Sequence, residues 1–168
     1  TYLYALHAPD RNARMAKINP DRFPNDGTPG KSGSGMTNEQ AWDILDDFEK
    51  KGLTPGVERI AQMVRVINEK RMALLESSGL VSEEELIVWR KAYGPDYIPL
   101  KGLEDVEVKG RGIGRGFDIR GKESKTAFGR RSMARNSPLI EVLSQMQQTI
   151  IRSRKNDVGK TLLTLVQK

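Results

Sequence analysis

Most apolar residues of the chain recur at intervals of three or four positions, which is the spacing of one face of an α-helix. The first such pattern covers residues 1–18, where Tyr2 and Leu6 share a face. Proline has no backbone N–H and clashes with the preceding helical turn. We therefore expect Pro9 to break this helix and residues 11–18 to form a second, short helical stretch.

Two further helices are predicted in residues 37–52 and 54–79, and a glycine ends each pattern. The first helix opens with Thr37 and Gln40, which match a capping box, an exchange of hydrogen bonds between side chains and backbone N–H groups across the first turn. The second helix has Thr54 as its predicted N-cap and a proline in its first turn. At about 1.5 Å per residue this helix is about 35 Å long and forms the main strut of the fold.

A fourth helix is predicted from Ser82, which forms a second capping box with Glu85, to Gly94. A fifth opens near Pro138, and a separate last helix is expected from Asp157 to the end of the chain. The fifth helix carries a wide apolar stripe. This stripe comprises Leu139, Ile140, Val142, Leu143, Met146, Ile150 and Ile151.

Two long segments rich in turn-forming residues interrupt these helices. Residues 19–35 combine Pro, Gly, Asn, Asp and Ser and are expected to be a flexible loop, and residues 109–135 contain six glycines without a sustained period. Between them, residues 97–100 include Pro99 and are expected to lie across the helices as an extended apolar strap. The fold class predicted is all-α, an irregular bundle of about five or six helices with two long polar loops.

The charge of the chain is concentrated in the second loop. The 168 residues contain 28 Lys and Arg against 22 Asp and Glu, for a formal net charge of +6, yet residues 109–135 alone carry +7 and the remaining chain −1. Cations on a glycine-rich backbone reach successive phosphates while aromatic side chains stack on bases. The alternative partner is an acidic helix face, in this chain or in a neighbouring protein. In either case the contact residues would be Lys109, Arg111, Arg115, Phe117, Arg120, Lys122, Lys125, Phe128, Arg130, Arg131 and Arg135.

The composition excludes several kinds of chemistry. With no cysteine and one histidine, the chain has no disulfide, thiol nucleophile, iron–sulfur cluster or multi-histidine metal site. Composition alone leaves a carboxylate site for Mg²⁺ or Ca²⁺ open, but the acidic run at residues 83–85 is explained by the helix dipole. Gly-Lys-Ser at 30–32 and Gly-Lys-Thr at 159–161 both lack the first glycine of a phosphate-binding loop. We therefore assign no catalytic, cofactor-binding or metal-binding residue.

His7 is the one candidate for acid–base catalysis. Asp10 lies three residues further on, but no serine or cysteine nucleophile is tied to His7 by a recognisable pattern. A lone histidine beside a proline is more often structural, and we expect His7 to hydrogen-bond a backbone carbonyl. The chain is accordingly predicted not to be an enzyme.

The length fits one domain, so residues 1–168 are predicted to form a single helical module. No apolar run reaches the roughly 18–20 residues that a membrane span needs, and no signal peptide is recognisable, so a soluble protein is expected. Domain termini are usually polar, whereas apolar residues crowd both ends of this chain. This predicts a segment of a longer polypeptide, the alternative being that both ends fold back onto the core.

Four stretches, in chain order, resemble a known family. They are YLYALHAPDRN at Tyr2–Asn12, GSGMT at Gly33–Thr37, SGLVSEEE at Ser78–Glu85 and YIPLKG at Tyr97–Gly102. Together they resemble a helical domain of the large polyvalent proteins of bacteriophages and mobile elements. The resemblance implies an all-helical module inside a much longer phage protein. Such a protein is packaged in the virion interior as an internal or ejection protein and delivered into the host cell, or carries polymerase, helicase or methylase modules elsewhere. It implies no catalytic residue.

The sequence and the resemblance together favour a non-enzymatic structural and interaction module without a small-molecule substrate. Its expected partners are other phage virion proteins or copies of itself, with DNA as a further partner through residues 109–135. The absence of disulfides and the small core suit passage through a narrow channel. The alternative is a sequence-tolerant DNA- or RNA-binding domain that acts in the host cell.

Overall fold

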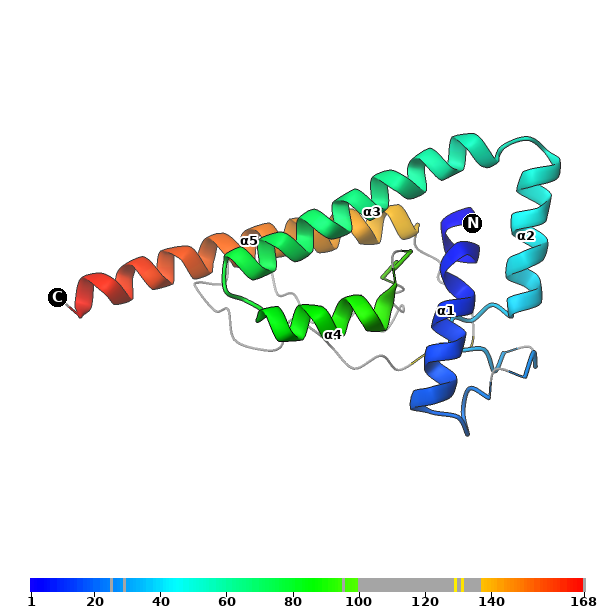
Figure 1. Cartoon of the computed structure of the whole chain (residues 1–168), viewed down its shortest axis with the longest axis horizontal. Coiled ribbons are helices and arrows are strands. Elements are labelled where there is room, and N and C mark those ends of the chain that lie inside the picture. The colour runs from blue at the N-terminus through cyan, green and yellow to red at the C-terminus, as the bar shows by residue number, and fades with distance from the viewer. Residues whose placement is uncertain are drawn as a thin grey trace.

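The computed structural model describes residues 1–24, 26–28, 30–94, 96–99, 129, 131 and 137–167. Within these residues the chain forms five helices and no strand, which confirms the predicted all-α class. Helices α3 and α5 lie side by side along the longest axis of the molecule, α1 and α2 pair near the start of α3, and α4 lies beside its second half (Figure 1). The helices are α1 (Tyr2–Ile18), α2 (Asn38–Lys50), α3 (Thr54–Ser77), α4 (Glu83–Tyr93) and α5 (Pro138–Val166).

Both predicted capping boxes are confirmed. At the start of α2 the Thr37 hydroxyl accepts a hydrogen bond of 3.1 Å from the Gln40 N–H, and the Gln40 side chain accepts one of 3.0 Å from the Thr37 N–H. Ser82 and Glu85 make the same exchange at the start of α4, at 3.3 and 3.2 Å. Local sequence therefore determines where these two helices begin.

Three predicted helix boundaries are wrong. Helix α1 continues through Pro9 without a break, because Asn12 and Met15 beyond the proline are as fully buried as Ala5 before it. Packing on both sides of Pro9 outweighs the roughly 3 kcal/mol that an internal proline costs. Helix α3 begins one residue before its predicted first turn, with Leu53 as the N-cap residue.

The third correction concerns the C-terminal helices, which are one helix. Asp157 lies inside α5, which runs unbroken from Pro138 to Val166. The polar residues around position 157 do not end the helix because two of them bind α3. Asn156 and Lys160 both donate hydrogen bonds to the backbone oxygen of Ser78, at 2.7 and 2.6 Å.

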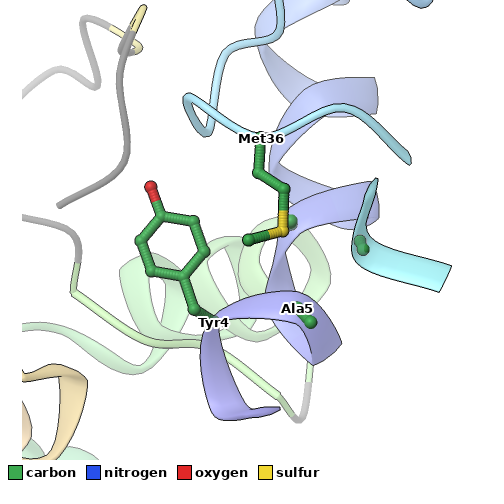
Figure 2. Close-up of a cluster of buried hydrophobic side chains, with 5 residues drawn as sticks. Tyr4, Ala5 and Met36 are labelled. Carbon is green, nitrogen blue, oxygen red and sulfur yellow. The ribbon is translucent and has the colours of Figure 1, made fainter. Parts of the chain in front are cut away.

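Helix α1 packs against α2 and the segment that precedes it. Tyr4 and Ala5 lie beside Met36 in the first buried apolar cluster (Figure 2). The Tyr4 hydroxyl donates a hydrogen bond to the backbone oxygen of Ser34. Asn12 is fully buried, and its side chain binds the backbone of Ser34 and Met36 as well as the side chain of Asn38, each at 2.8 Å. The C-terminal part of the 19–35 segment is thus fixed against α1, while the expected flexibility of the segment stays a prediction.

Helices α3 and α5 run in the same direction with a constant register. Val64 and Val142 share a buried cluster, Arg71 donates a hydrogen bond of 3.2 Å to the Thr149 hydroxyl, and Asn156 binds Ser78. In each case the partners are 78 residues apart, and successive contacts follow at intervals of seven residues. Such an interval keeps the contacts on one side of each helix, as in a coiled coil.

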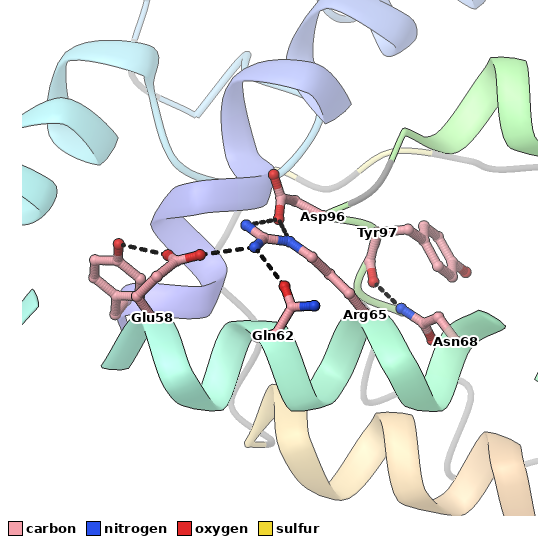
Figure 3. Close-up of polar contacts among 7 residues, drawn as sticks. Glu58, Gln62, Arg65, Asn68, Asp96 and Tyr97 are labelled. Atoms are coloured by element: carbon pink, nitrogen blue, oxygen red, sulfur yellow. Dashed lines mark hydrogen bonds and ion pairs between the residues drawn. The ribbon is translucent and has the colours of Figure 1, made fainter. Parts of the chain in front are cut away.

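The predicted strap is confirmed for the residues that the structure describes. Ile98 is buried with Val64 and Val142, and Asn68 of α3 donates a hydrogen bond of 2.8 Å to the Tyr97 backbone oxygen. Beside this contact Arg65 binds Asp96 (Figure 3). The strap therefore fastens the chain after α4 to the middle of α3.

Candidate functional site on the outer face of α5

Helix α5 has two different faces. The inner face packs on α3 and includes Val142, Thr149 and Ser153, all of them buried. A second set of apolar side chains lies about 80–180° around the helix from Val142, as expected from 3.6 residues per turn. We call this set the outer stripe; it comprises Ile140, Leu143, Ile150, Ile151, Val158 and Leu165.

The outer stripe is open to solvent. Ile151 is partly buried, whereas the other five side chains are between 42% and 65% exposed. Scattered exposed apolar residues are ordinary, but an aligned set along one helix face marks an interaction surface. Its length, from Ile140 to Leu165, is about 38 Å at 1.5 Å per residue.

One ion pair lies at the middle of the outer stripe. The Arg154 guanidinium is 3.6 Å from the Asp157 carboxylate, one turn further along α5, and the two side chains are 78% and 47% exposed. An exposed pair of this kind contributes little to the stability of the helix. Both charges are therefore accessible to a partner that covers the stripe.

The C-terminal end of α5 projects beyond the end of α3 (Figure 1). Lys160 makes the last hydrogen bond to α3, at Ser78, and its ammonium group lies so close to Gly79 that a Cβ there would be 2.7 Å from it. Beyond this contact, Leu162, Leu163 and Val166 are exposed together with Leu165. Smaller exposed apolar groups lie on α3 at Ile60, Met63 and Val66, and on α4 at Ile87 and Val88.

The apolar stripe predicted on the fifth helix contained part of this surface, without distinguishing its buried side from its exposed side. The structure divides it, since Val142 faces α3 while Ile140, Leu143 and Ile150 face outward. The sequence signal for an exposed apolar face was the width of this stripe. Its seven apolar residues within 13 positions cover more of the helix surface than one neighbouring helix can bury.

The basic segment lies almost entirely outside the described residues. Of the eleven predicted contact residues the structure describes only Arg131, which is exposed. Gly129 has a φ of +69° and lies against the buried ring of Phe23, where an added Cβ would come within 2.5 Å of a ring carbon. The charge of this segment is therefore known from sequence, and its partner stays a prediction.

His7 is buried in α1 and has no hydrogen-bond partner among the described residues, so the predicted bond to a carbonyl is wrong. Its ring lies edge-on to Tyr97, with the centroids 5.7 Å apart. Burial and, to a lesser extent, the nearby Arg11 charge lower the pKa of His7 to about 3. At neutral pH the imidazole is uncharged and enclosed, an environment that favours a packing role.

A small cavity of about 160 Å³ lies at the start of α2. It is lined by charges of both signs, among them Lys31, Asp26 and Glu39, and by the exposed Trp42. Among the described residues no three acidic or histidine side chains are grouped so that they could hold a metal ion. This cavity shows no preference for one class of ligand.

Comparisons with known protein-family models, curated proteins and solved structures found no match for the chain. In the part of the chain that the structure describes, no helix has both the length and the apolar character required to cross a membrane.

Proposed function

We propose that this protein is a non-enzymatic helical module that assembles with other polypeptides through the exposed apolar faces of its long helices. The observation that carries the proposal is the outer stripe of α5, from Ile140 to Leu165. Burial of a half-exposed leucine or isoleucine contributes about 1 kcal/mol. The five exposed side chains on this face, together with the apolar side chains of a partner helix, supply enough apolar surface to offset the cost of association.

The motifs of the resemblance have structural roles in the described chain, which suits a module without catalysis. Within Tyr2–Asn12, Tyr4 and Asn12 bind the backbone of the Gly33–Thr37 stretch, and His7 packs on Tyr97 of the last motif. Ser82 and Glu85 cap α4. These residues hold the helices in place.

We propose further that the module belongs to a large phage protein packaged in the virion and delivered into the host cell with the genome. Support for this setting comes from the resemblance, from a chain without cysteine and from the small size of the three buried clusters that the described residues form. Small cores without covalent links unfold at low cost.

Mass spectrometry of purified particles of the encoding phage tests this setting. We expect the protein among the virion components, with chemical cross-links from Lys155 and Lys160 of α5 to other virion proteins or to further copies. Absence of the protein from the particles would overturn the ejection role. Presence without any cross-link from α5 would instead contradict the proposed use of its surface.

A second candidate function, sequence-tolerant DNA or RNA binding in the host cell, is favoured by the +7 charge of residues 109–135. Binding of the full chain to duplex and single-stranded DNA should weaken with salt, with a slope of about −0.9 per duplex phosphate neutralised. Alanine at the cations of this segment should flatten the slope. Two exposed cations of α3, Arg59 and Lys70, provide a matched control, and absence of binding at low salt would exclude this function.

A further inference from the structure

We infer that two copies of this chain associate through their outer stripes, with the two α5 helices antiparallel about a two-fold axis near Arg154. The inference rests on the proposed function, because it names the partner of the surface on which that function depends. Three features of α5 support it: the length of the stripe, the symmetry of its residues about Arg154, and its central charges.

The length of the stripe calls for a long partner helix. A face of about 38 Å is covered only by a helix of about 25 residues. Among the described helices, α5 has 29 residues and α3 has 24, while the others have 17 or fewer. Helix α3 already lies against the inner face of α5, so a second α5 is the matching helix that the protein itself provides.

Four of the six residues of the outer stripe are arranged symmetrically about Arg154. Leu143 and Leu165 each lie eleven positions from it, and Ile150 and Val158 each lie four positions from it. A two-fold interface brings one surface against itself, so that residue i meets residue j and j meets i. Antiparallel helices that cross at Arg154 would therefore place leucine opposite leucine at both ends, and isoleucine opposite valine nearer the axis.

The central charges favour the antiparallel direction. In this arrangement Asp157 of each copy lies about 4.5 Å along the axis from Arg154 of the other, close enough for reciprocal ion pairs. Because the axis lies at Arg154, the two Arg154 side chains meet in either direction, but parallel helices would also place Asp157 against Asp157. The antiparallel direction separates the two Asp157 side chains by about 9 Å along the axis. The Arg154 side chain is 78% exposed and needs no rearrangement of the fold to make the new contact.

A single pair of helices is a small interface, so we expect a dissociation constant of about 1–100 µM. Sedimentation velocity of the full chain should show a monomer–dimer equilibrium in this range. Val158→Lys should raise the dissociation constant at least about tenfold, because it buries a positive charge one turn from the like charge of Arg154. Arg154→Glu should also weaken the dimer, and the charge exchange Arg154→Glu with Asp157→Arg should restore it.

The matched control for these variants is Leu163→Glu. Leu163 and Leu165 lie at the same end of α5 and are 58% and 65% exposed, but they point to opposite sides of the helix. Leu165→Glu should weaken the dimer, whereas Leu163→Glu should leave it within about twofold of wild type. Because all these side chains are exposed, circular dichroism should show the same helix content and melting temperature in each variant.

Disulfide cross-linking tests the relative direction of the two α5 helices. Only the introduced cysteines can form disulfides, because the natural chain has no cysteine. Leu143→Cys and Leu165→Cys should form a mixed disulfide when combined. Each alone should form few, since identical positions in an antiparallel pair are about 33 Å apart. Efficient homodimeric disulfides in place of mixed ones would overturn the antiparallel arrangement.

A wild-type chain that stays monomeric at several hundred micromolar, or a dimer that Val158→Lys leaves intact, would overturn the second copy as the partner. Neither result removes the proposed function, which is tested separately by cross-links from α5 to other virion proteins. Loss of both the dimer and those cross-links would contradict the inference and the proposed function together.

Discussion

The side-chain amide of Asn156 donates a hydrogen bond of 2.7 Å to the backbone oxygen of Ser78, the residue that follows the last turn of α3. The same oxygen accepts a second hydrogen bond of 2.6 Å from the Lys160 ammonium. One carbonyl thus joins the end of α3 to the middle of α5. This contact holds the two helices in register at the point beyond which α5 continues alone.

The losses of stability caused by removing the two hydrogen bonds to Ser78 should be strongly non-additive. Either Asn156→Ala or Lys160→Ala leaves the carbonyl with one donor and should lower the free energy of unfolding by about 1 kcal/mol. The double variant removes both donors and should cost more than the sum of the two, about 3 kcal/mol. Urea unfolding followed by circular dichroism measures these differences. Thr161→Ala, which loses a hydrogen bond within the exposed side of α5, is the control, and simple additivity would contradict the prediction.

Asn12 should be among the polar residues that matter most for stability. Its buried side chain makes three hydrogen bonds of 2.8 Å, two of them to backbone groups of Ser34 and Met36. Asn12→Ala leaves these groups unsatisfied and should lower the free energy of unfolding by about 3 kcal/mol. Asn38→Ala, which removes only one of the three partners, should cost about 1 kcal/mol. Equal losses in chemical denaturation would show that the backbone contacts contribute nothing.

The stability of the protein should fall below pH 6.5 because of His7. The pKa of this histidine is about 3 in the folded state against 6.5 for an exposed histidine, so between these values the unfolded chain binds a proton that the folded chain does not. Stability is therefore complete above pH 6.5 and decreases as pH falls toward 3, by about 2 kcal/mol at pH 5.

Thermal unfolding between pH 5 and 8 tests this dependence. His7 is the only histidine of the chain, and Asp10, Arg11 and Arg14 are the charged residues that line the small cavity beside it. His7→Phe keeps an aromatic ring against Tyr97 and should remove the decrease between pH 6.5 and 5. A decrease of the same size in this variant would assign the effect to other groups.

Arg65 should contribute more to stability than an exposed arginine with a similar partner. Its guanidinium donates to Asp96 and Glu58 at 2.7 Å, with the side chain 27% exposed (Figure 3). Lysine has a single ammonium group and cannot span both carboxylates, so Arg65→Lys should cost about 1–2 kcal/mol. Arg90→Lys is the matched control, because the Arg90–Glu69 pair is more than half exposed and should be worth under about 0.5 kcal/mol. Denaturant midpoints that shift equally would contradict this difference.

The start of α2 and of α4 could be predicted because the contacts that fix them lie within three residues. The break at Pro9 and the separate helix from Asp157 were predicted on the same local grounds and are wrong, because contacts distant in sequence outweigh the local preference there. The sequence predicted only part of the candidate site. Its apolar residues were found, but their division between α3 and solvent depends on which face of α5 the Val64–Val142 contact occupies.

By itself, the sequence determined the helical class, the capped helix starts and the location of the positive charge, since each depends on composition or on neighbours within one helical turn. Only the tertiary structure decided that α3 and α5 run in the same direction, with contacting residues 78 positions apart in the chain. It also decided that Asn12 is buried and binds three other residues through its side chain. These features depend on contacts between segments far apart in the chain, which no local pattern specifies. The outer stripe follows from them, because one face of α5 is free only when the other is occupied.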